Sequence, residues 1–118
     1  KVRTPQVGRL EDIVISHVTA ENARYTSFVM GHPENPARRI RLTDIQIRKG
    51  RGFAAQPRKE PVPELPEVYP HPRQFGELPS HGFYARHVRE LHLCAARFLT
   101  TDPDARPPVV MEDVTEES

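Results

Sequence analysis

The chain lacks the features that would place it in several common classes of protein. Its 118 residues include one cysteine, Cys94, so no disulfide can form within the chain. No apolar run approaches the roughly 20 residues that a membrane-spanning helix needs, and no signal-peptide pattern opens the sequence. The net charge is only +1, whereas nucleic-acid binders usually carry a strong basic excess. We therefore expect neither a membrane span nor a nucleic-acid partner, and the compartment stays open.

What the sequence does contain is one apolar pattern that occurs three times, in residues 10–20, 38–47 and 89–98. Each copy has apolar residues at repeat positions 0, 2, 5 and 7: Ile13, Ile15, Val18 and Ala20; Ile40, Leu42, Ile45 and Ile47; Leu91, Leu93, Ala96 and Phe98. A spacing of two is the period of a β-strand. The step from position 2 to position 5 predicts a bend that keeps both apolar pairs on one side, whereas a helix would follow another spacing.

The intervals between the copies differ by one long insertion. Ile13 and Ile40 are 27 residues apart, whereas Ile40 and Leu91 are 51 apart. The excess falls in residues 49–80, which hold 7 of the 13 prolines and so cannot form a central strand. Shorter apolar segments at 27–30, 82–85 and 108–111 complete the pattern. The sequence predicts an all-β solenoid of about three parallel coils, with one domain over residues 1–118 and a long Pro-rich loop.

Stacked coils would place like residues one above another. Ile13, Ile40 and Leu91 should form one interior column, and Ile15, Leu42 and Leu93 a second. Asp12 and Asp44 are expected to stack one coil apart, and Cys94 to be buried as a small hydrophobe. The end coils would expose unpaired strand edges, which predicts a homo-oligomer.

Five segments resemble the bacterial polygalacturonase-like glycoside hydrolases, which degrade pectin. The segments read DIVISHVTAENA (residues 12–23), RIRLTDI (39–45), YPHPRQFGELP (69–79), GFYARHV (82–88) and DARPPVVMEDV (104–114). The later ones are the more specific, and they are similar to the family's last coils, beyond its catalytic centre. The resemblance implies a right-handed parallel β-helix and the C-terminal portion of a hydrolase acting on galacturonate-type polysaccharide.

The same resemblance leaves the chemistry open. Family members are inverting hydrolases that use a carboxylic acid and a carboxylate base. Their motifs Asn-Thr-Asp, Asp-Asp, Gly-His-Gly and Arg-Ile-Lys are absent here, so the resemblance assigns no catalytic residue. Alone, the chain is expected to be inactive. The alternative hypothesis is a small non-enzymatic solenoid with an oligomerising, binding or scaffold role.

Candidate binding residues for an acidic polysaccharide are aromatic rings that can stack on sugar and basic or imidazole side chains that can hold a carboxylate. We assign this role to Tyr25, His32, Tyr69, Arg73, Arg86 and His87. Other residues have plainer expected roles. Tyr84 should pack, His87 and His92 should point outward, and Asp102 and Asp104 should bind backbone N–H groups in a turn. A basic group could bind the carboxylates of a polyuronate, but the favoured interpretation is a solvated loop surface; its members are Arg48, Lys49, Arg51, Arg58 and Lys59.

Cofactors are not expected. The six histidines show no recognised zinc-ligand spacing. Ser27, Ser80 and Cys94 have no base and orienting acid at a characteristic spacing, so the sequence does not support nucleophilic catalysis.

Overall fold

The computed structural model describes residues 10–58, 60–62 and 78–116. Their regular elements are β1 (Glu11–Ala23), β2 (Ser27–Met30), β3 (Ala37–Lys49), β4 (Phe83–Thr100) and β5 (Val109–Glu116). All pairs between these strands are parallel. Among the described residues, no helix is long and apolar enough to cross a membrane. The predicted all-β, parallel architecture is confirmed.

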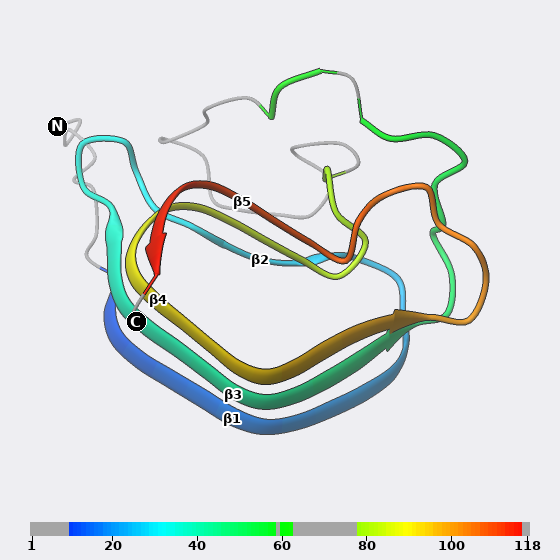
Figure 1. The fold of residues 1–118 in the computed structure, drawn as a ribbon, viewed down its shortest axis with the longest axis horizontal. Helices are drawn as coiled ribbons and strands as arrows, with labels where there is room; N and C mark the ends of the chain where they lie inside the picture. The colour runs from blue at the N-terminus through cyan, green and yellow to red at the C-terminus, as the bar shows by residue number, and fades with distance from the viewer. Residues whose placement is uncertain (1–9, 59, 63–77, 117–118) are drawn as a thin grey trace, which may run out of the picture.

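The sheet is curled into two walls (Figure 1). In the lower wall β1 pairs with β3, and β3 with residues 88–100 of β4. In the upper wall β2 and β5 both pair with the first residues of β4, from Phe83 to Arg86. The long strand β4 therefore belongs to both walls and joins them.

Strand register follows the apolar repeat. Ile13 pairs with Ile40 and Ile40 with Leu91, and Ile15, Leu42 and Leu93 form the next column, which confirms both predicted columns. Contacts between β4 and β5 join residues 26 apart, such as His87 and Asp113. The strand β5 therefore continues the parallel pairing at nearly the interval that separates β1 from β3, and the insertion lies in the longer interval between β3 and β4.

Left-handed residues form the bends of the lower wall. The first corner row, at repeat position −1, contains Asp12, Arg39 and Glu90 with φ of 55°, 54° and 63°. The second corner row, at position 4, contains His17, Asp44 and Ala95 with φ of 57°, 56° and 52°. A single residue in this region turns the chain while its neighbours stay extended. The predicted bend is thus confirmed, and the apolar spacing changes at the second row.

Three expectations about these strands are wrong. Asp12 and Asp44 do not stack, because they occupy different corner rows: Asp12 lies beside Arg39, and Asp44 beside His17. Cys94 is exposed because its position in the repeat faces outward. The segments 82–85 and 89–98 are one strand, since His87 with φ of 55° turns β4 without ending its ladder.

The main core fills the inside of the curl. Its most buried members are Ala37, Ile40, Leu42, Ile45, Phe83, Ala85, Val88, Leu91 and Phe98. Phe83 and Phe98, near opposite ends of β4, stack with ring centroids 5.8 Å apart. Full burial of one such side chain stabilises a fold by roughly 1.5–3 kcal/mol.

A second cluster lies on the outside of the upper wall. Tyr84 is fully buried there, as predicted, against Val62 and Leu78 of the insertion. Phe28, Met30 and Val110 pack against the same cluster. Because side chains alternate along β4, Phe83 and Ala85 face the main core while Tyr84 faces the insertion. The described ends of the insertion therefore cover the upper wall.

Candidate functional site

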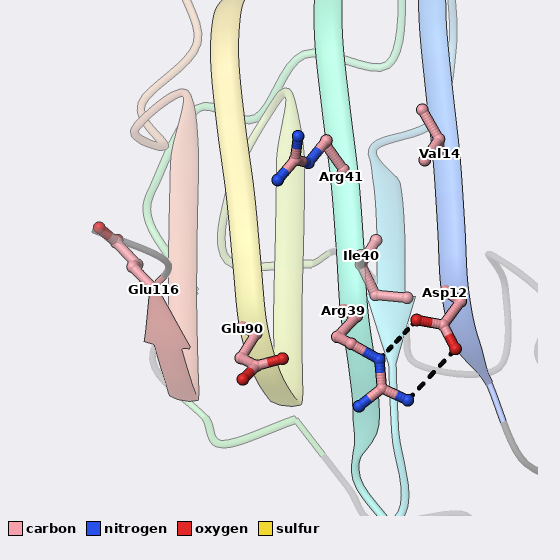
Figure 2. Close-up of a pocket in the computed structure, with 7 residues that line it drawn as sticks. All are labelled: Asp12, Val14, Arg39, Ile40, Arg41, Glu90 and Glu116. Carbon is pink, nitrogen blue, oxygen red and sulfur yellow. Dashed lines mark hydrogen bonds and ion pairs between the residues drawn. The ribbon is translucent and has the colours of Figure 1, made fainter.

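The first corner row places three charged side chains next to one another on the lower wall. Arg39 on β3 lies between Asp12 on β1 and Glu90 on β4 (Figure 2). Arg39 Nε donates to Asp12 Oδ1 at 2.5 Å, and Arg39 Nη2 donates to Asp12 Oδ2 at 3.2 Å. Nη2 also reaches Glu11 Oε2 at 3.2 Å. The row follows from the strand register, which aligns position −1 of β1, β3 and β4.

The ion pair fixes the charge state of this row. The hydrogen bond from Arg39 lowers the pKa of Asp12, and the same bond raises the pKa of Arg39. Both groups are therefore charged at neutral pH. The Arg39 and Asp12 side chains are 47% and 64% exposed, so the pair contributes little to stability. The row therefore alternates between negative, positive and negative side chains across β1, β3 and β4.

A groove of about 540 Å³ opens beside this row (Figure 2). Its lining residues are Asp12, Val14, Arg39, Ile40, Arg41, Glu90 and Glu116. The volume falls within the range of small-ligand sites. Three carboxylates against two guanidinium groups leave the lining net negative, so the groove suits a cationic or hydrogen-bonding group better than a polyanion.

The carboxyl groups with a clearly shifted pKa are poor candidates for a catalytic acid. The pKa values of Asp12, Asp104 and Asp113 are all lowered. For Asp113 the causes are hydrogen bonds from His87 and then Arg89. A glycosidase acid must stay protonated, which requires a raised pKa. Within the described part of the chain, no cluster of three or more His, Cys, Asp or Glu side chains could hold a metal ion.

Two buried arginines fasten the insertion to the sheet. Arg86 on β4 pairs with Glu112 on β5 at 2.8 Å and donates from Nη1 to the Val62 carbonyl at 2.8 Å. Arg106 pairs with Asp104 at 2.7 Å and donates to the carbonyls of Gly52 at 3.1 Å and Leu78 at 3.3 Å. Arg86 therefore fastens the middle of the insertion to β4 and β5, and Arg106 fastens the two ends of the insertion to the 101–108 connection.

A second surface lies at the connection between β1 and β2. Tyr25 is 41% exposed, and the Arg24 guanidinium carbon lies 5.6 Å from the centre of its ring. Gly52 packs on this connection with φ of +71°, and a Cβ built there would lie 2.7 Å from the Arg24 carbonyl oxygen. Arg51, the residue before Gly52, is exposed. We call Arg24, Tyr25 and Arg51 the basic end.

The four predicted binding residues that the structure describes, Tyr25, His32, Arg86 and His87, have different surroundings. Tyr25 and His32 lie beyond opposite ends of β2, and His32 Nδ1 accepts a hydrogen bond from Glu34 N at 3.0 Å. Arg86 is 7% exposed and fastens the insertion. The His87 side chain is 12% exposed and its Nδ1 lies 2.7 Å from Asp113 Oδ2, so another side chain covers most of it. Tyr69 and Arg73 lie outside the described residues.

Other side chains in the predicted turns and basic group also find partners. Asp104 accepts from the backbone N–H groups of Ala54 and Arg106, which confirms its expected turn role. Lys49, expected to be solvated, is 3% exposed, because its Nζ donates to the Arg24 carbonyl at 2.5 Å inside the structure. Arg48 pairs with Glu21 at 3.2 Å.

Sequence reasoning missed the corner groove and the role of Arg106. The groove could have been found by extending the repeat to position −1, where acidic, basic and acidic residues alternate in Asp12, Arg39 and Glu90. No sequence signal points to Arg106, because its partners Gly52 and Leu78 contribute backbone carbonyls that any residue would offer.

Comparison with known proteins gives no relative for this chain. No family model, no curated protein and no solved structure matches it.

Proposed function

We propose that the chain forms C-terminal coils of a right-handed parallel β-helix of the polygalacturonase-like glycoside hydrolases. The observation that supports this proposal most is the solenoid-like repeat itself. The paired strands stack in parallel register at intervals of 27 residues for β1 and β3, 51 for β3 and β4, and 26 for β4 and β5, with left-handed corners aligned in rows. The single insertion carries the family-like loop wording, and its described ends pack on the upper wall.

In this proposal the coils bind galacturonate-type polysaccharide and do not hydrolyse it alone. The corner groove is net negative, so a polyuronate would avoid it. The basic end suits such a ligand better, because the exposed Tyr25 ring lies beside the Arg24 guanidinium group, and the exposed Arg51 precedes Gly52, which contacts the Arg24 backbone. Arginine can hold a carboxylate through two parallel hydrogen bonds, and Tyr25 can pack against a sugar ring.

The test is binding of oligogalacturonate to the purified chain at low salt, followed by NMR chemical shifts. We expect Arg24→Gln and Arg51→Gln each to weaken binding several-fold, in line with roughly 0.5–1 kcal/mol for an exposed charged contact. Arg97→Gln is the matched control, since Arg97 is an exposed arginine on β4 that is not part of the basic end. An uncharged oligogalactose of equal length should not bind. Equal binding of both sugars, or reducing-sugar release by the isolated chain, would contradict the proposal.

The alternative function, an oligomerising solenoid, also rests on a specific observation. Three of the four large hydrophobic side chains that are exposed in the described residues lie in or next to β1: Leu10 at 39%, Val14 at 67% and Ile15 at 44%. Exposed apolar strands at a sheet edge favour association. Sedimentation velocity distinguishes the two functions, because a stable oligomer indifferent to oligogalacturonate supports the alternative.

A further inference from the structure

The outer edge of β1 is unpaired within the described structure. The strand pairs with β3 on one side, and no other described strand pairs with it. Its inward-facing side chains are only partly covered at this end of the stack. Ile15 is 44% exposed, whereas Leu42, its neighbour in the same column, is 6% exposed. One more coil would cover β1 as β1 covers β3.

The shape of this edge restricts what can pair with it. Asp12, His17 and Asn22 are left-handed, with φ of 55°, 57° and 58°, so the 13-residue strand bends every five residues. A straight strand would separate from β1 at the first bend. Only a strand with corners at the same spacing can keep its backbone hydrogen bonds along the whole length.

The charged side chains of β1 indicate which charges a strand paired with its free edge should carry. Towards β3, Asp12 meets Arg39 at 2.5 Å, His17 meets Asp44 at 2.8 Å and Glu21 meets Arg48 at 3.2 Å. The first corner row continues this alternation to Glu90 (Figure 2). An alternating row extended past Asp12 needs a basic side chain as its next member.

We propose that the free edge of β1 docks a parallel, bent strand with the charge pattern of β3. That strand carries basic residues at repeat positions −1 and 8, an acidic or amide residue at the left-handed position 4, and apolar residues at positions 0, 2, 5 and 7. The inference rests on the proposed function in one respect: the docked strand belongs to the preceding coil of the same polypeptide. Its basic residue at position −1 would lie beside Asp12, at the negatively charged groove.

A second copy of the chain fits this edge poorly. Stacking β1 of one copy on β4 of another is obstructed near Leu91, where β5 already pairs with β4, and it would set Asp12 beside Glu90. Antiparallel pairing of two β1 strands with their apolar faces aligned would set Asp12 opposite Glu21 of the second copy. Like charges directly opposite each other destabilise a strand pair.

The test uses the full chain and a synthetic peptide with the sequence of residues 37–49, ARRIRLTDIQIRK. We expect the peptide to slow hydrogen exchange of β1 amides and shift their NMR signals, while the amides of β3 keep their protection. A matched peptide with Arg39→Glu and Arg48→Glu should bind about tenfold more weakly, as expected for two reversed ion pairs. The protein variant Glu21→Lys should reduce this preference, because it reverses the charge that faces position 8.

Several results would overturn the inference. They are equal binding of the two peptides, no change at β1 at millimolar peptide, or loss of β3 protection, which would indicate strand exchange. Sedimentation of the chain alone should give a monomer, and a dimer dissolved by Val14→Lys would assign the edge to a second copy. Oligogalacturonate binding at the basic end reports on the proposed function separately, so either proposal can fail while the other stands.

Discussion

At the scale of single residues, the most constrained charge is the Asp104 carboxylate in the connection between β4 and β5. Its side chain is fully buried, and burial alone would raise its pKa. Hydrogen bonds from the Arg106 side chain and from the backbone N–H groups of Arg106 and Ala54 outweigh burial and lower the pKa from 3.8 to about 2. The carboxylate thus holds Arg106 in position to bind the carbonyls at both ends of the insertion.

This pair predicts a loss of stability in acid. The folded-state pKa of Asp104 lies below the ordinary value of 3.8, so the unfolded chain takes up the proton first as the pH falls. The stabilisation, on the order of 2 kcal/mol, is present above about pH 4 and lost as the pH approaches 2. Urea unfolding of the wild type and Asp104→Asn at several pH values measures it.

The Asp104→Asn variant separates the contribution of Asp104 to acid sensitivity from the contribution of the other carboxyl groups. Asp104→Asn should be destabilised at neutral pH by roughly 3–5 kcal/mol, because it leaves a buried guanidinium without its counter-charge. It should also lose less stability than the wild type between pH 4 and pH 2. Parallel stability curves for the two proteins across this range would contradict the assigned role of Asp104.

At the scale of elements, the sequence predicted the features that depend on the period of the apolar residues. It predicted few of the features that depend on rare backbone conformations. The columns through Ile40 and Leu42 follow from apolar spacing alone. The existence of a bend was predictable, but the left-handed residues include Arg39, Glu90 and Ala95, which have no special preference for that region. The mistaken stacking of Asp12 and Asp44 has another cause, because the two residues occupy repeat positions −1 and 4, which the register of Ile13 with Ile40 already separates.

The second corner row offers a direct test of this backbone conformation. Ala95 is exposed with φ of 52°, so its substitutions act mainly through the backbone. A β-branched residue is strongly disfavoured there, and we expect Ala95→Val to cost about 1–3 kcal/mol. Ala95→Gly should be neutral or stabilising by up to about 1 kcal/mol, because glycine adopts this region freely.

The adjacent residue supplies a matched control on the same strand. Cys94 is also exposed but has an extended backbone, where valine is favourable. Cys94→Val should therefore change the urea midpoint little. If Ala95→Val proves no more harmful than Cys94→Val, the left-handed corner is not a constraint on stability.

At the scale of the whole molecule, the two clusters of buried side chains are expected to unfold together. They share β4, whose Phe83 and Ala85 face the main core while Tyr84 faces Val62 and Leu78 of the insertion.

Leu78→Ala removes a side chain that is 3% exposed, and truncations of this kind cost about 2–5 kcal/mol. Native-state hydrogen exchange should show reduced protection for the Ile40 and Leu42 amides of β3 as well as for Ala54. If protection fell at Ala54 alone, the insertion would be a separate unit that only rests on the sheet. Pro79→Ala is the control at the neighbouring position, because that residue is only partly buried and should leave the exchange of β3 unchanged. The expected loss across both walls follows from one strand crossing between them.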